Sequence, residues 1–179
     1  MDAEARKRRF DRVHDACYED VRRYAWRRAP GLADDVVAET FLVAWRRLDD
    51  IPEEPLPWLI GVARNVLLNM RRAERRQEQR EARAQQLDPG GEERAFADVV
   101  GEFAALRASL EALPERDREI LFLSAWEEFD PAAIAAIMGC TRANVALRLF
   151  RARKRLAAAM TAATVNPACS APPGAGGAG

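Results

Sequence analysis

The chain has 179 residues, of which 49% are hydrophobic and 31% are charged, with 28 basic and 28 acidic side chains. This length accommodates one ordinary domain or two small ones, and the formal net charge of zero provides no overall attraction to nucleic acid. One histidine and three cysteines without paired spacing exclude a His-based triad and indicate neither a disulfide framework nor a metal site.

Two helices are predicted before the first proline-rich segment. Apolar residues three and four apart predict a helix from Asp2 to Ala29, which Pro30-Gly31 ends, and His14 within it is expected to be solvated. The second helix begins near Ala33. Its inner stripe consists of Val37, Phe41, Ala44 and Leu48.

The second helix also carries an acidic face. Asp34, Asp35 and Glu39 lie in its first turns, where carboxylates are stabilised by the helix dipole. The dipole does not explain why Trp45 accompanies them. An acidic face with an aromatic side chain also suits a protein-binding surface.

The segment Asp49–Pro57 contains three prolines and is predicted to be a stiff loop. A third helix is expected to start near Trp58, with the buried stripe Leu59, Val62, Val66 and Met70. Two amides and two guanidiniums, at intervals of four, three and four, share another face of this helix. These are Asn65, Asn69, Arg72 and Arg76. Asparagine is a poor helix former, so this face indicates base-edge contacts or, alternatively, an ordinary solvated surface.

A charged linker is predicted to divide the chain. The segment Gln77–Gln86 is almost entirely charged or amide and prolongs the helix, and Asp88-Pro89-Gly90-Gly91 ends it. The expected fold class is all-α, with two small helical domains joined by a flexible charged linker. The bounds are 1–83 for the first domain, 84–98 for the linker, 99–160 for the second domain and 161–179 for a tail expected to be disordered.

The second domain begins with apolar residues at helical spacing, namely Val99, Phe103, Leu106 and Leu110. Pro114 is placed to open the next helix, which is expected to bury Ile120, Leu121 and Trp126.

A helix-turn-helix pattern follows. Asp130 caps and Pro131 opens one helix, Gly139 ends it, and Thr141 caps another. The inner stripe of the last helix consists of Val145, Leu149, Ala152 and Leu156. The segment Arg142–Arg155 holds six basic residues and no acidic one, which is typical of a helix against phosphates, although a solvated basic face is the alternative.

The order of these parts resembles a known family. The segments Asp34–Leu48, Pro57–Asn65 and Arg71–Arg76 resemble domain two of bacterial sigma factors of the extracytoplasmic-function (ECF) group. Leu113–Leu121 and Ile134–Arg153 resemble domain four of the same group. The resemblance implies a subunit of RNA polymerase that is not an enzyme. This subunit would direct core polymerase to promoters and aid strand opening. The resemblance is also compatible with an anti-sigma factor as a further partner.

The resemblance also implies site residues. Core polymerase would be contacted by Asp35, Glu39, Phe41 and Trp45. The minus-ten element would be contacted by Trp58, Arg64, Asn65, Asn69, Arg71, Arg72 and Arg75, with Asn65 beside a base flipped into a pocket. The minus-thirty-five element would be contacted by Arg142, Asn144, Leu147, Arg148 and Arg151.

The chain departs from the family pattern at three positions. Ala133 stands near where the family usually carries Glu, and Ala146 and Leu147 replace a basic residue and a hydroxyl. These changes remove two phosphate or base contacts, while Leu147 offers an apolar group to a thymine methyl or to packing.

Two alternatives remain at this stage. A helix-turn-helix regulator would bind duplex DNA without polymerase, and a helical adaptor would bind only protein. No cofactor is expected. No apolar run approaches the ~20 residues of a membrane span and the first residues are charged, so a cytoplasmic protein without membrane association is expected.

Overall fold

The structure is a computed structural model that describes residues 3–85 and 104–165. All regular structure in these two ranges is helical, which confirms the all-α prediction. The α-helices are α1 (Ala3–Arg28), α2 (Ala33–Arg46), α3 (Pro55–Gln85), α4 (Ala104–Glu111), α5 (Glu115–Ala125), α6 (Pro131–Met138) and α7 (Arg142–Val165), with short 3-10 turns η1 (Pro30–Leu32) and η2 (Leu48–Asp50).

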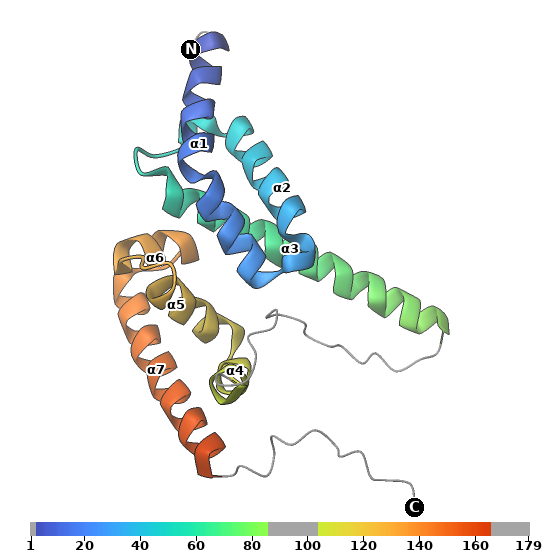
Figure 1. Ribbon diagram of the computed structural model, residues 1–179. Coiled ribbons are helices and arrows are strands. Elements are labelled where there is room, and N and C mark those ends of the chain that lie inside the picture. The colour runs from blue at the N-terminus through green and yellow to red at the C-terminus, as the bar shows by residue number, and fades with distance from the viewer. Residues whose placement is uncertain (1–2, 86–103, 166–179) are drawn as a thin grey trace, which may run out of the picture.

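The first unit consists of α1, α2 and α3, which pack on one another (Figure 1). Helix α1 buries Cys17, Val21 and Tyr24, at the three- and four-residue spacing that predicted it. The predicted inner stripe consists of Val37, Phe41 and Ala44 in α2 and Leu48 in η2, and all four residues are at most 6% exposed. The local sequence pattern therefore identified the buried faces of these first two helices.

Helix α3 begins earlier than predicted, at Pro55 instead of near Trp58. Pro55 and Pro57 both lie in its first turn, where a backbone N–H has no intrahelical partner. A missing N–H costs nothing there, and the fixed φ of proline suits the helix. The prolines that predicted a loop through Pro57 therefore start the helix instead.

The buried positions of α3 also differ from the prediction. Leu59 is buried as expected, but Ile60, Ala63 and Leu67 complete the buried set, while Val62 is half-exposed. Helix α3 packs against α1 and α2 on one side and against α6 on another. The four buried residues still fall within one stripe about 100° wide, but this stripe is rotated from the predicted one. The sequence pattern does not show which apolar residues the neighbouring helices cover most closely.

The second unit, α4 to α7, contains the predicted helix-turn-helix. The Asp130 carboxylate accepts hydrogen bonds from the N–H groups of Ala132 (2.8 Å) and Ala133 (2.7 Å). Gly139 adopts a positive φ of 62°, and the Thr141 hydroxyl accepts a bond from the Asn144 N–H at 3.3 Å. The predicted caps and stop are thus confirmed.

One packing prediction for this unit is wrong, because Trp126 is 50% exposed. It lies just after the end of α5, with its ring 5.0 Å from that of Phe122. Predictions for residues 86–103 and for the tail after Val165 fall outside the described residues.

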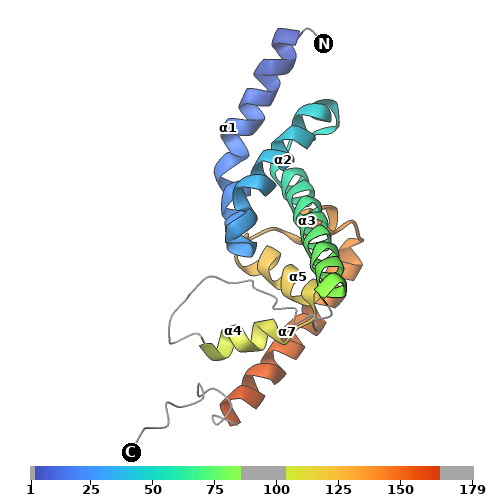
Figure 2. The same ribbon diagram turned by 90° about the vertical axis from the view of Figure 1, so that its right-hand side faces the viewer.

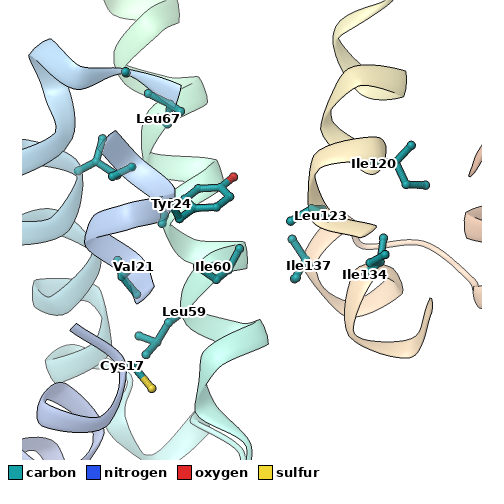
Figure 3. Packing of buried hydrophobic residues seen from close by; sticks show 14 of the residues in the cluster. Cys17, Val21, Tyr24, Leu59, Ile60, Leu67, Ile120, Leu123, Ile134 and Ile137 are labelled. Carbon is teal, nitrogen blue, oxygen red and sulfur yellow. The ribbon is translucent and has the colours of Figure 1, made fainter. Parts of the chain in front are cut away.

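The two units touch through α3 and α6. Figures 1 and 2 show α5 and α6 beside α3, while α4 and the C-terminal end of α7 lie away from the first unit. In Figure 3, Ile60 of the first unit and Ile137 and Leu123 of the second belong to one buried hydrophobic cluster. No single described helix is long and apolar enough to cross a membrane, although α6 and α7, bent by 98°, meet that test as a pair.

Candidate nucleic-acid interface

Helix α7 presents the basic face that the sequence predicted. Arg142, Asn144 and Arg151 are exposed and Arg148 is half-buried, because Val145 and Leu149 turn the opposite side of the helix into the core. Leu147 is 46% exposed beside them. None of the three arginines has an ion pair with another described residue, so their guanidiniums are available to phosphates or base edges.

Arg155 does not belong to this face. Its guanidinium donates a hydrogen bond to the carboxylate of Asp117, which is 6% exposed. The pair joins α7 to α5 within the second unit. The basic segment therefore includes one cation with a structural role.

Helix α3 exposes its polar face as predicted. Asn65, Asn69, Arg72 and Arg76 are all exposed, on the side away from the buried Ala63. The four side chains share one face of a regular helix, which holds amides and cations in a fixed order. Such a face can contact base edges with its amides and phosphates with its guanidiniums.

Three of the predicted residues on α3 line one groove, which lies between α3 and α6. Trp58, Arg64 and Asn65 contribute from α3, and Asp130 and Ala133 contribute from the second unit. The guanidinium of Arg47 lies 5.8 Å from the centre of the Trp58 ring. The groove combines an aromatic surface, an amide and cations, which are the groups that hold unstacked bases and a strand.

A second, strongly cationic cleft lies between α3 and α5. Arg64, Arg71 and Arg72 line it from α3, opposite Glu115 and Glu119. The guanidinium of Arg71 lies 3.8 Å from the carboxylate of Glu115. Arg64 thus borders both hollows, whereas neither hollow is lined by Asn69 or Arg75.

A buried ionic cluster beside this cleft was not predicted from the sequence. Arg28, at the end of α1, is 7% exposed and lies 3.4 Å from Glu119 and 3.3 Å from Glu127. The Tyr24 hydroxyl donates a 3.0 Å hydrogen bond to Glu119, and Arg27 donates one of 3.2 Å to Glu127. The charged residues at the end of α1 alternate with others along the helix, and nothing in that pattern indicates that Arg28 pairs with carboxylates more than 90 residues away. The sequence therefore offered no signal for this cluster.

The ionisation of the cluster follows from its burial. Burial raises the pKa of Tyr24 well above its ordinary value, and the Glu119 carboxylate adds to that shift. Burial alone would lower the pKa of Arg28, but the charges of the Glu119 and Glu127 carboxylates help to outweigh it and raise that pKa. Arg28 therefore stays charged and Tyr24 stays neutral where the two units meet.

Helix α2 exposes the acidic face that the sequence predicted. Asp35 is exposed and Glu39 half-buried, with Arg46 at 4.0 Å from the Glu39 carboxylate. Trp45 is 40% exposed and is held by Arg6, which donates a 2.8 Å hydrogen bond to its carbonyl oxygen. The carboxylates and the indole form one exposed helical surface that a basic, partly apolar partner would fit.

Phe41 and His14 support this surface from beneath. Phe41 is only 6% exposed, so it packs inside the unit instead of pointing outward. The His14 ring lies 4.7 Å from that of Phe41 and 5.1 Å from that of Tyr18. The His14 side chain is 37% exposed, so it is partly solvated as expected, and its ring also packs on this aromatic face. Its four-residue spacing from Phe10 and Tyr18 was the signal that it shares their face.

Comparison with protein families matches both units. Residues 13–77 match the model of sigma-70 region 2, and residues 103–156 match the model of sigma-70 region 4. The first match contains α2 and the polar face of α3. The second contains the helix-turn-helix and the basic face of α7.

Curated relatives cover most of the chain. The chain is 34% identical over 132 residues to the ECF RNA polymerase sigma factor EcfG of Rhodopseudomonas palustris. The aligned region covers 70% of this chain and 70% of that protein. The chain is also 32% identical over 143 residues to the RNA polymerase sigma factor CnrH of Cupriavidus metallidurans. That aligned region covers 72% of this chain and 73% of CnrH.

Two solved structures share the fold. One is the sigma factor RpoE in complex with the anti-sigma factor NepR from Bartonella quintana, with a TM-score of 0.63, 22% identity, and 85% of this chain and 96% of that chain covered. The other is CnrH in complex with the cytosolic domain of CnrY, with a TM-score of 0.54, 24% identity and 90% of each chain covered.

Proposed function

The chain belongs to the ECF group of RNA polymerase sigma factors, and from this membership we propose that it directs core RNA polymerase to promoters and aids strand opening through three separate surfaces. The carrying observation is that regions 2 and 4 match in one chain and that each matched unit exposes a cationic helix face. A regulator that binds duplex DNA by its helix-turn-helix does not require region 2. Membership of the sigma family therefore replaces both alternatives, the regulator and the adaptor.

The first surface is the docking site for core polymerase on α2. Asp35 and Glu39 supply the charge, and Trp45 supplies the exposed apolar contact. The buried Phe41 supports the Trp45 indole through Phe10, whose ring lies 6.4 Å from Phe41 and 5.2 Å from Trp45. A protein contact of this composition gains most from its buried aromatic anchor, with the acids setting orientation and association rate.

The second surface is the strand-capture face of α3. Asn65 reads an extruded base and Trp58 offers a ring for stacking, while Arg64, Arg71 and Arg72 hold the strand. Asn69 and Arg75 extend the same function along α3. Strand opening is favoured because the unstacked base gains a pocket and its phosphates gain cations.

The third surface is the start of α7, which we assign to the minus-thirty-five duplex. Arg142, Arg148 and Arg151 contact phosphate or guanine edges, Asn144 contacts an adenine edge, and Leu147 contacts a thymine methyl. Ala146 on α7 and Ala133 on α6 leave the helix-turn-helix with fewer polar groups than the family pattern implies.

We assign no chemical reaction to the protein, since its role is binding. The proposed domain bounds are 1–83 and 99–160 with the linker 84–98 between them, although α3 reaches Gln85 and α7 reaches Val165. A role on promoter DNA with core polymerase places the protein in the cytoplasm. An anti-sigma factor is a further partner of this proposal.

Run-off transcription tests the proposed function. Purified core polymerase is given a library of promoters with and without the protein, and specific transcripts are expected only when the protein is present. Duplex binding by the protein alone with no effect on transcription would instead support an ordinary regulator.

A further inference from the structure

The α2–α3 connection, residues 47–54, borders the groove beside Trp58. Pro52 and Glu54 of this connection line the groove together with Trp58 and Asn65. Outside the short turn η2 the connection has no regular structure, so its shape depends on what holds it. Figure 1 shows the connection beside α1. Its position therefore sets the room that an extruded base has in the groove.

Arg6 of α1 holds the start of the connection. Its guanidinium donates a 2.8 Å hydrogen bond to the Trp45 carbonyl oxygen and a 3.2 Å bond to the Asp49 carboxylate. Trp45 lies in the last turn of α2, where backbone carbonyls lack an intrahelical donor and an arginine can supply one. The same guanidinium lies 5.5 Å from the centre of the Trp45 ring. Arg6 thus fixes the point at which the chain leaves α2.

Arg9, one turn later in α1, holds the far end of the connection. Its guanidinium donates a 2.8 Å hydrogen bond to the carbonyl oxygen of Ile51, a residue that is 3% exposed. Behind the connection, Arg9 and Arg12 line a second hollow with Pro52, which also lines the Trp58 groove. Because this hollow leaves room behind Pro52, loss of the Arg9 bond would let the connection move away from Trp58.

The family match does not include these two arginines. The match with sigma-70 region 2 begins at residue 13, after both Arg6 and Arg9. Among the described residues that line the Trp58 groove, neither arginine is present. Both guanidiniums end on acceptors of the protein itself, so any effect on a bound strand passes through the connection.

We propose that Arg6 and Arg9 are positioning residues for minus-ten recognition, which act through the α2–α3 connection. They fix one wall of the groove in which Trp58 and Asn65 receive the extruded base. This inference rests on the proposed sigma function, which it deepens. A groove that is already fixed binds a base without first having to be ordered, and this favours both affinity and selectivity.

Base preference at the minus-ten element tests this role. The double variant Arg6→Ala, Arg9→Ala removes the bonds to the connection, and Lys7→Ala, Arg8→Ala is the matched control. Lys7 and Arg8 pair with carboxylates of α1 itself, so the control removes the same two charges without touching the connection. Run-off transcription is measured on promoters that differ at one minus-ten base at a time. Because preference is a ratio between promoters for one holoenzyme, weaker docking of core polymerase at Trp45 does not enter it.

The double variant should lose at least about fivefold of the preference at the extruded base, the lower end of what one base contact contributes. Arg9→Ala and Arg9→Lys form a second pair, in which only the lysine form should keep the preference, because one donor suffices for one carbonyl. Unchanged preference in the double variant would overturn the role. An equal loss in the matched control would overturn it as well, since charge alone would then explain the effect.

Hydrogen exchange of the free protein, followed amide by amide by NMR, is a second measurement that needs no polymerase. The N–H groups of Asp50 and Ile51 donate to backbone carbonyls within the connection, so their exchange reports its order. Both should exchange at least about fivefold faster in the Arg6, Arg9 double variant than in the control. Equal exchange in the two proteins would overturn the positioning role. Faster exchange with no transcription from any form would reject the sigma function while leaving the hold of α1 on the connection intact.

Discussion

Arg155 of α7 donates a hydrogen bond to the buried carboxylate of Asp117 in α5, a residue 38 positions earlier in the chain. The bond removes Arg155 from the basic face and uses its charge to hold the helix-turn-helix against α5. Among the residues that the structure describes, Arg155 forms an ion pair, whereas Arg142, Arg148 and Arg151 of the same basic segment do not.

Arg155→Ala should therefore destabilise the second unit without weakening the DNA contact itself. It leaves a buried carboxylate without its partner, so the free energy of unfolding should fall by about 1–3 kcal/mol. Urea unfolding followed by circular dichroism measures this. Arg153→Ala is the matched control, since Arg153 is exposed, and should change stability by less than about 0.5 kcal/mol. Equal losses in both variants would show that the Asp117 bond is not structural.

Asn65→Ala and Arg148→Ala should impair different steps of initiation. If Asn65 reads an extruded base, its loss leaves closed-complex binding nearly intact, impairs strand opening and relaxes preference at one minus-ten position. Permanganate footprinting of open complexes measures that step.

Arg148→Ala should instead weaken the closed complex. Holoenzyme affinity should fall by roughly 1–3 kcal/mol if the guanidinium contacts a base, or fall evenly across sequences with a shallower salt dependence if it contacts phosphate. Filter binding at several salt concentrations distinguishes these cases. The same defect in the same step for both variants would refute the assignment of α3 and α7 to separate elements.

Reversing the charges of Asp35 and Glu39 to Lys should weaken binding to core polymerase. The two acids lie one helical turn apart on α2 and would then repel a basic partner surface. Binding of labelled core at moderate salt measures the loss, with circular dichroism to confirm the fold. Glu74→Lys with Glu78→Lys on α3 reverses two charges at the same spacing away from α2 and should bind core normally. Unchanged affinity in the α2 variant would remove these acids from the interface.

The stability of the protein should fall in alkali because of Tyr24. Its pKa is raised in the folded state by burial, whereas an unfolded tyrosine ionises near pH ~10. Above that pH the unfolded state is stabilised because its Tyr24 loses a proton while the folded state keeps its own. The contribution of Tyr24 to the free energy of unfolding is therefore complete below pH ~10 and declines by about 1.4 kcal/mol per pH unit above it. Urea unfolding between pH ~8 and ~11 should show this decline relative to Tyr24→Phe. Parallel pH profiles in the two proteins would contradict it.

Local sequence determined the elements whose signals lie within a few residues. Asp130, Gly139 and Thr141 placed the helix-turn-helix because capping bonds and positive φ act over one to three residues. The stripe of α2 and the polar face of α3 followed from helical periodicity for the same reason. These patterns also carried the resemblance from which the family was recognised.

Only the tertiary structure decided which faces became interfaces. Ile60 and Leu67 are buried because α3 is covered on two sides, and Trp126 is exposed because the chain turns just after α5. Arg28 and Arg155 look like any other surface cations in the sequence, yet their partners Glu119 and Asp117 lie 91 and 38 residues away. Periodicity specifies which side of a helix is apolar, but it does not specify what covers that helix, because long-range packing depends on how separate helices fit together.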